Sequence, residues 1–511
     1  MKRNHILFTL IFCFISSNII AQIINLAKIA EGKIVYTSTL FDSKKQLFGY
    51  LYIYENDKED KEHKSLEYVL LDKNLNRVSN KEFSDKIYKR VYSKYYDCTL
   101  MGDNIILNKY YYYYSSFQQT YNPLLTTYQI ISLKNNTVSG EFKYADGKFT
   151  EFVADFDDMK TQYKGNETKS VIYSFNLKDL KGFYVEDRNI DKSYAEKELK
   201  FFNEEKQNIW SYEYNPNPSR SKYSTYSFLH THDNNLYLGI SKIKLKPFST
   251  TDPYKKIEYK IVAVDLLTGK TKFEYILDKL NADTIHFTEL KQINKNLIIT
   301  GLYAEKNNIN PFTFVSRYLG AYRIILNEEG KVVEKKYYDW SKFSDKIKIT
   351  DKGCIEGGFY LQPLSYYVFK DGSVSILTEE QKNKVIGGGF FYKNYVLFTF
   401  DKEFNIKNIH EIERNTTEGD DGFLFSQYIN DESNVLFFNN KIEINAETKK
   451  KEYFLFINKI INGDYTFEKI PLTINKKNSI LPFPAKEGYI MLQEYNEDEK
   501  FYQIRLERLN Y

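Results

Sequence analysis

The feature that most constrains this chain is a strand–turn–strand pattern that recurs along its length. Runs rich in β-branched and aromatic residues are separated by short turns that contain Asp, Asn, Gly or Lys. Because Gly and Asn tolerate the positive φ of tight hairpin turns, each unit predicts a β-hairpin. The seven hairpins expected in this way span residues 68–78, 128–138, 260–273, 322–333, 366–376, 395–406 and 453–467.

Most of these hairpins follow a further strand that itself begins at a polar turn. Such strands begin near residues 32, 103, 234, 295, 433 and 487. A repeated antiparallel module of three or four strands is typical of a β-propeller, which also protects strand edges by closing into a ring. The sequence therefore predicts an all-β propeller of seven blades, with eight as the alternative. A pair of stacked β-sandwich domains is the competing architecture.

Long loops and one helical insertion are also expected. Seven blades would each use about 70 residues, more than the ~40–50 of compact propeller repeats. Ser193–Glu196 has the form of a capping box, and Ala195, Leu199 and Phe202 recur at helical spacing. We therefore expect one short helix in this region, followed by a loop at residues 215–219.

The amino terminus has the features of an export signal. Lys2 and Arg3 precede an apolar run, Ile6–Ile15, that is shorter than the roughly 18–20 residues a membrane-spanning helix needs. Ala21 offers a small residue for cleavage. We expect residues 1–21 to be a signal peptide, and residues 22–511 to form a propeller-like repeat domain without a transmembrane segment, in the periplasm or outside the cell.

Composition excludes some partners and cofactors. The formal net charge is only +4, so the chain lacks the strongly basic character that nucleic-acid binding requires. Cys98 and Cys354 are too few for a disulfide scaffold. Two buried free thiols are the favoured interpretation, and one bridge between them is the alternative. The sequence contains no G-x-S-x-G or H-E-x-x-H motif and no phosphate-binding loop before a helix. We expect no cofactor.

One histidine cluster is a candidate metal half-site. His230 and His232 would share one side of a strand, with Asp233 at its end. A third or fourth ligand would have to come from another blade. The alternative is that all three residues lie at an exposed turn.

The tyrosines are the most unusual feature. The chain has 46 of them, and residues 110–114 are five in succession. On a strand, Tyr110, Tyr112 and Tyr114 would face one way, which predicts an aromatic platform for a sugar or a protein. The alternative is packing between sheets with hydroxyl groups at the rim.

A resemblance extends over residues 287–376. This region contains FTELKQINKNLIITGLYAEKN, GAYRIILNEEGKVVEKKYYDW and GGFYLQPLSYYVFKDGSVSIL. It resembles a family of exported bacterial proteins that have propeller-like repeats and no assigned function. The resemblance implies a propeller-like fold and transfers no catalytic or binding residue.

Three hypotheses for function follow. The first is a non-enzymatic exported propeller that binds a protein or a glycan. The second is a carbohydrate-active enzyme with paired carboxylates from different blades at the mouth of the axis. The third is a structural protein of the cell envelope without a small ligand. The absence of catalytic motifs and the richness in aromatic residues favour the first.

Overall fold

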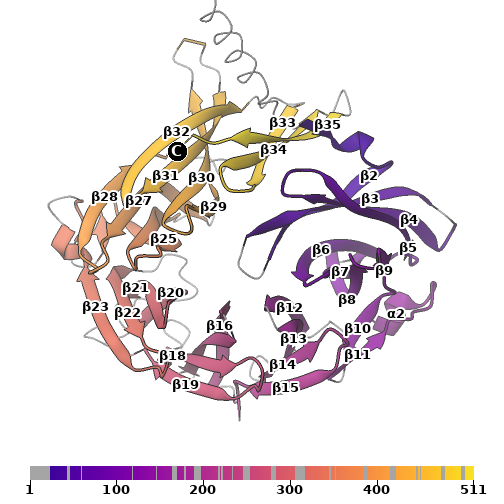
Figure 1. Cartoon of the computed structure of the whole chain (residues 1–511), viewed down its shortest axis with the longest axis horizontal. Coiled ribbons are helices and arrows are strands. Elements are labelled where there is room, and N and C mark those ends of the chain that lie inside the picture. The colour runs from indigo at the N-terminus through magenta and orange to yellow at the C-terminus, as the bar shows by residue number, and fades with distance from the viewer. Residues whose placement is uncertain are drawn as a thin grey trace, which may run out of the picture.

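The fold is a ring of eight antiparallel sheets, each of which is one blade of a β-propeller (Figure 1). Within a blade, the strands follow one another from the centre of the ring to its outside. The computed structural model describes residues 23–42, 46–58, 60–117, 119–145, 147–163, 170–177, 180–188, 197–216, 219, 222–232, 234–245, 254–277, 284–304, 317–343, 347–350, 353–384, 389–414, 422–444, 447–448, 451–472, 478–496 and 501–510.

Blades 1 to 4 occupy the first half of the chain. Blade 1 contains β2 (Lys33–Phe41), β3 (Leu47–Lys58), β4 (His63–Asp72) and β5 (Arg77–Lys86). Blade 2 contains β6 (Tyr92–Met101), β7 (Asn104–Ser115), β8 (Thr120–Ser132), β10 (Phe142–Ala145) and β11 (Lys148–Glu151), and β9 (Thr137–Val138) also pairs with β8. Blade 3 contains β12 (Ser170–Leu177), β13 (Leu180–Arg188), β14 (Lys197–Asn203) and β15 (Asn208–Glu213). Blade 4 contains β16 (Lys222–His232), β17 (Asn235–Leu245), β18 (Tyr254–Asp265) and β19 (Thr271–Ile276).

Blades 5 to 8 complete the ring. Blade 5 contains β20 (Thr284–Ile293), β21 (Asn296–Ala304), β22 (Tyr318–Leu326) and β23 (Val332–Asp339). Blade 6 contains β24 (Cys354–Ile355), β25 (Phe359–Val368), β26 (Val374–Asn383), β27 (Phe390–Phe400) and β28 (Ile406–Ile412). Blade 7 contains β29 (Phe423–Ile429), β30 (Asn434–Ile444), β31 (Lys451–Ile461) and β32 (Asp464–Leu472). Blade 8 contains β33 (Asn478–Pro484), β34 (Tyr489–Asn496), β35 (Phe501–Arg508) and β1 (Ile23–Asn25).

Helix is scarce in the described residues. It is limited to η1 (Leu26–Lys28), α2 (Met159–Tyr163) and η2 (Trp340–Phe343). Within the described part of the chain, no helix has the length and apolar character to cross a membrane. The all-β prediction is therefore confirmed, and the count of seven blades is wrong, because the ring has the eight blades given as the alternative.

The short helical insertion expected near residue 193 is wrong where the structure describes it. Residues 193–196 lie outside the described part of the chain, and residues 197–203 form β14. Leu199 and Phe201 pack toward blade 4, whereas Phe202 packs toward blade 2. Both faces of this strand are buried, so the apparent helical spacing came from apolar residues on two opposite faces.

Burial of both sheet faces is general in this ring and explains the continuous apolar runs. On β21, Ile299 packs with Ile261 of blade 4, and the neighbouring Ile298 packs with Val368 of blade 6. Full burial of one such side chain stabilises the fold by about 1.5–3 kcal/mol. Alternate residues of one strand thus hold it against two different neighbours.

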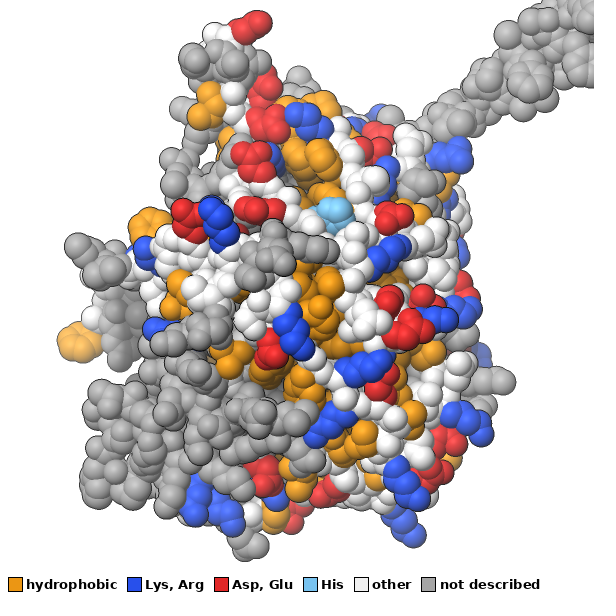
Figure 2. Space-filling model, turned by 90° about the vertical axis from the view of Figure 1, so that its left-hand side faces the viewer, with side chains coloured by type: hydrophobic (Ala, Val, Ile, Leu, Met, Phe, Trp, Pro, Cys, Tyr) orange, Lys and Arg blue, Asp and Glu red, His pale blue; other side chains and the backbone are white. Residues whose placement is uncertain are grey.

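On the outer side of the ring, hydrophobic and charged side chains are mixed. Figure 2 shows hydrophobic side chains there in a broken stripe between lysines and acidic residues. Val333 on β23 and Phe467 on β32 are among the exposed hydrophobic residues. Lys336 and Lys407 lie on the outer strands β23 and β28. Lysines on outer strands oppose edge-to-edge pairing with other chains.

Blade 8 closes the ring with strands from both ends of the described chain. β1 pairs antiparallel with β35, in the register Ile23↔Arg505, Ile24↔Ile504 and Asn25↔Gln503. The following Leu26 is fully buried, and its carbonyl oxygen accepts a hydrogen bond of 3.0 Å from the Tyr54 hydroxyl group of blade 1. β1 is therefore anchored to β35 by backbone pairing and to blade 1 through the adjoining Leu26.

The two cysteines of the described chain are free. Cys98 is buried between blades 1 and 2, and Cys354 is half-buried on β24. Both are therefore free thiols in this structure, but only Cys98 is buried as expected.

A turn glycine offers a test of the packing between blades. Gly330 has a φ of 74°, and a Cβ atom there would lie 2.4 Å from Cδ2 of Phe273 on the preceding blade. Gly330→Ala should lower the free energy of unfolding by about 1–3 kcal/mol, because it adds backbone strain to a steric clash. Chemical denaturation measures the change.

Gly422→Ala is the matched control. Among the described residues other than its chain neighbours, none has an atom within 4 Å of a Cβ placed at Gly422, and its φ is not in the left-handed region. Its stability should stay within about 0.5 kcal/mol of the parent. Equal losses in both variants would contradict the role given to Gly330.

Candidate functional site on the second blade

The tyrosine run lies on β7, the second strand of blade 2. Tyr110 and Tyr112 stack, with ring centroids 6.0 Å apart and an interplanar angle of 25°. Tyr111 points to the opposite side, where it is buried against Tyr88 and Phe152. The alternation expected from the sequence is therefore present in the structure.

Neighbouring strands extend this row. In the sheet register, Tyr92 of β6 is opposite Tyr112, and Tyr121 of β8 is opposite Tyr114. The ring centroids of Tyr92 and Tyr112 are 5.7 Å apart, and those of Tyr114 and Tyr121 are 5.2 Å apart. Cross-strand aromatic pairs of this kind contribute roughly 0.2–1 kcal/mol each, so the rings hold one another in place.

One further ring completes the group. Tyr96 occupies a β-bulge of β6 and contacts Tyr110 edge-on, with ring centroids 6.3 Å apart. We call these rings together the tyrosine surface. Its members are Tyr92, Tyr96, Tyr110, Tyr112, Tyr114 and Tyr121.

The tyrosine surface is open to solvent although its rings are ordered by mutual contacts. Tyr92 is 52% exposed, Tyr121 is 65% exposed and Tyr114 is 45% exposed. Phe117, in the turn between β7 and β8, is 97% exposed. Large apolar rings with this exposure, gathered on one hairpin, are typical of a contact surface.

The topology places the tyrosine surface on one particular side of the ring. Strand direction alternates within each blade, so in a four-stranded blade the connections to both neighbouring blades lie on the same side as the turn between the second and third strands. In blade 2 the turn between β7 and β8 likewise lies on the side where β6 begins. Tyr92 begins β6, and the turn at Ser116–Phe117 joins β7 to β8. The tyrosine surface therefore lies on the face where the chain arrives from blade 1.

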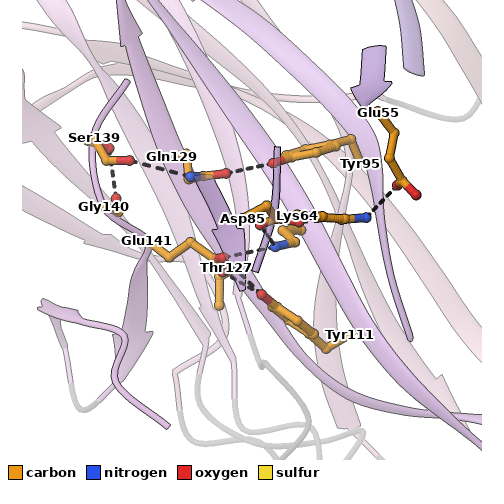
Figure 3. Close-up of polar contacts among 11 residues, drawn as sticks. Glu55, Lys64, Asp85, Tyr95, Tyr111, Thr127, Gln129, Ser139, Gly140 and Glu141 are labelled. Atoms are coloured by element: carbon orange, nitrogen blue, oxygen red, sulfur yellow. Dashed lines mark hydrogen bonds and ion pairs between the residues drawn. The ribbon is translucent and has the colours of Figure 1, made fainter. Parts of the chain in front are cut away.

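Figure 3 shows a buried group of polar contacts that includes Asp85, Tyr111 and Glu141. This group lies on the side of β7 to which Tyr111 points, opposite the tyrosine surface. The ammonium group of Lys109 contacts Oδ1 of Asp85, which is on β5 of blade 1, and lies 2.9 Å from Oε1 of Glu141. The side chains of Lys109 and Asp85 are each 1% exposed, and that of Glu141 is 10% exposed. This group joins the outermost strand of one blade to the interior of the next.

Hydroxyl and amide groups surround these charges. Tyr111 and Thr127 donate hydrogen bonds to Glu141, at 2.9 Å and 2.5 Å respectively. Tyr95 donates to the side-chain oxygen of Gln129 at 2.8 Å. Lys64 lies 3.8 Å from Oδ2 of Asp85 and 2.6 Å from Glu55.

Burial perturbs the acid–base properties of the group. Burial raises the pKa of Asp85 above its usual value, although the positive charge of Lys109 opposes this. Burial alone would lower the pKa of Lys109, but the negative charges of Asp85 and Glu141 raise it. Burial, with the nearby charge of Glu141, holds the pKa of Tyr111 well above its usual value.

The predicted metal half-site is only partly described. His230 and His232 are two residues apart on β16, and their backbones pair with Tyr237 and Asn235. Asp233 and the side chain of His230 lie outside the described residues, so the metal site stays a prediction. In the part of the chain that the structure describes, no group of three or more His, Cys, Asp or Glu side chains is arranged to hold a metal ion.

Sequence reasoning missed part of this site. Tyr121 follows the turn and joins the surface only through the pairing of β7 with β8. Lys109 immediately precedes the tyrosine run. A lysine inside a strand that is apolar on both faces could have indicated a buried charge. Its partners Asp85 and Glu141 could not be identified, because they lie 24 and 32 positions away.

The ring and its closure define the class of this protein, an eight-bladed β-propeller. The chain belongs to the DUF6770 family, described as a family of unknown function, whose model matches residues 1–412. The match ends with the last residue of β28, so it includes blades 1 to 6. No curated protein matches the chain.

Solved structures with similar folds include proteins of different kinds. The WD40 domain of SCAP from fission yeast has 8% identity and a TM-score of 0.41, with 95% of this chain and 94% of that chain covered. Prolyl oligopeptidase B from Galerina marginata has 8% identity and a TM-score of 0.33, with 83% and 46% covered. The GH93 alpha-L-arabinofuranosidase of Fusarium graminearum has 14% identity and a TM-score of 0.31, with 66% and 93% covered. Likeness at this level carries no argument about partner or activity.

Proposed function

We propose that this protein is an exported, non-enzymatic propeller that binds a protein partner through the tyrosine surface. The observation that carries the proposal is the exposure of Tyr92, Tyr114 and Tyr121 on rings that already contact one another. Tyrosine offers a large, rigid contact area with a polar tip and loses little side-chain entropy on binding. Rings that are ordered before binding reduce that cost further.

Phe117 favours a protein over a glycan. Its ring has no polar atom and is 97% exposed in the turn beside the tyrosine surface. An apolar ring of this kind gains most by entering a desolvated pocket of a partner, as interface hot spots do. Sugars, which carry a hydroxyl group on most carbons, offer no such pocket.

The test is whether a variant of the tyrosine surface loses its binding to a specific partner. Replacing Tyr92, Tyr112 and Tyr121 together by serine should weaken binding at least about tenfold, because hot-spot residues contribute about 2 kcal/mol or more. Chemical cross-linking on the producing cells would identify the partner. Its affinity would then be measured with purified components.

The matched control is Tyr495→Ser, which changes a tyrosine that is 42% exposed on blade 8. It should bind the partner as the parent does. Binding to a glycan array that the triple variant loses would replace the protein partner by a glycan. Equal affinity of the triple variant and the parent would overturn the proposal.

Export is part of the same proposal and has its own test. The signal-like segment Met1–Ala21 supports it, and cleavage should leave Gln22 as the first residue. Amino-terminal analysis of the protein recovered from the periplasm or the medium should find this end. Recovery of uncleaved protein in the cytosol would contradict export.

A further inference from the structure

The buried group around Lys109 has a geometry that goes beyond an ordinary ion pair. The Lys109 ammonium contacts Asp85, lies 2.9 Å from Glu141, and is enclosed by aromatic rings. Its nitrogen is 4.8 Å from the ring centre of Tyr111 and 5.8 Å from that of Tyr95. An amine and a carboxyl group are thus held together where bulk water is excluded.

The two carboxyl groups differ in their partners. Glu141 accepts hydrogen bonds from Tyr111 at both oxygens and from Thr127, so its position is fixed. Oδ2 of Asp85 is buried and accepts no hydrogen bond, and the ammonium group of Lys64 is 3.8 Å away. Asp85 is therefore the carboxyl group with an oxygen free to leave.

We propose that Lys109 and Asp85 become joined by a spontaneous isopeptide bond, with Glu141 as the proton carrier. The amide would link Nζ of Lys109 on β7 to Cγ of Asp85 on β5. It would connect blade 2 to blade 1 covalently, in a chain whose two described cysteines form no bridge.

The chemistry needs no oxidant and no co-reactant. A proton passes from the Lys109 ammonium group to the carboxyl group of Asp85, with Glu141 accepting and returning it, which leaves a neutral amine and a neutral acid. The nitrogen lone pair then forms the bond to Cγ. The bond between Cγ and one oxygen breaks, and that oxygen leaves as water, carrying the acid proton and one proton from nitrogen. The sum is one amide and one water from one ammonium and one carboxylate.

Three features of the surroundings bear on this step. Fixed contact between the amine and the acid replaces an encounter in solution with a step inside one molecule. Burial raises the pKa of Asp85 and so favours its neutral form, whereas the negative charges of Asp85 and Glu141 raise the pKa of Lys109 and favour its charged form until its proton is transferred. Glu141 lies within hydrogen-bond distance of Lys109, as a general acid–base group must.

Peptide mass spectrometry of the full chain, purified and denatured, tests the proposal. If the bond forms, trypsin should release residues 82–86 joined to residues 95–134, with no cleavage after Lys109 and a mass lower by one water. Without the bond, residues 82–86, 95–109 and 110–134 appear as separate peptides. Cyclisation of an amino-terminal Gln22 would release ammonia rather than water and would change a different peptide, so it cannot be mistaken for the link.

Three variants sharpen the result. Glu141→Gln, which has nearly the same shape, should reduce the linked fraction at least tenfold. Asp85→Asn should still form the link, now with loss of one ammonia in place of water. Lys64→Met, which removes the neighbouring cation but no reacting atom, should keep the link. Separate, unmodified peptides from the folded parent protein would overturn the proposal.

Discussion

Replacing Lys109 by methionine should destabilise the propeller by roughly 3–5 kcal/mol relative to a parent in which Lys109 and Asp85 are not covalently joined, the cost of breaking a buried ion pair from one side. Relative to a parent that carries the proposed isopeptide bond, loss of the cross-link adds to this cost. The substitution leaves Asp85 and Glu141 buried without their shared cation. Because these residues join blade 1 to blade 2, the effect should appear as a lower midpoint of guanidinium unfolding. A double variant, Lys109→Met with Glu141→Gln, should recover part of the loss by removing one unpaired charge.

Lys370→Met is the matched control. Lys370 pairs with Asp431, but these side chains are 61% and 79% exposed. Exposed pairs contribute about 0–1 kcal/mol, so this variant should unfold near the parent midpoint. A Lys109→Met protein as stable as the Lys370→Met protein would contradict the structural role of the buried group.

Replacing Trp340 by alanine should cost about 3–5 kcal/mol, the range for truncation of large aromatic core residues. Trp340 begins η2, is fully buried, and stacks on Phe398 of blade 6 with ring centroids 4.5 Å apart. Phe343 lies against both rings. The truncation would open a cavity between blades 5 and 6, and guanidinium unfolding measures the loss.

Trp340→Phe separates volume from polarity at this position. The indole nitrogen is buried and has no hydrogen-bond partner, so its removal costs no bond. The phenylalanine variant should therefore lose no more than about half of what the alanine variant loses. Similar losses in the two variants would contradict this prediction, because the phenyl ring would then contribute nothing to the packing at this position.

The hairpins were predictable from sequence because their signals are local. The seven expected turns all join paired strands of the structure. The assignment of these hairpins to blades was not predictable in this way, because it depends on which hairpins share one sheet. Residues 366–376 and 395–406 contain hairpins of the same sheet, blade 6, because β26 and β27 pair across residues 384–389.

Two blades were missed for different physical reasons. In blade 3, Leu199 and Phe202 appear at helical spacing because both faces of β14 are buried. Blade 8 combines β1 with β35, and no pattern within a short window can reveal a pairing such as Ile24 with Ile504. Burial on two faces and long-range pairing both remove the regular alternation on which sequence reasoning depends.

The candidate site, like the blades, was predictable only where it depends on local sequence. The shared side of Tyr110, Tyr112 and Tyr114 follows from strand geometry alone. The contributions of Tyr92 and Tyr121 depend on the register between strands, which the sequence does not specify. The residues near Lys109 depend on packing between two blades, so they could be identified only in the structure.

The pairing of β1 with β35 has a consequence for the order of assembly. A ribosome completes blade 1 through blade 7 before it has made the residues that β1 must pair with. Until then the first strand has no neighbour in its own sheet, and the growing chain is an open arc rather than a circle. Translation stopped before Phe501 would leave two unmatched ends, which cellular proteases and chaperones would meet as an incomplete molecule.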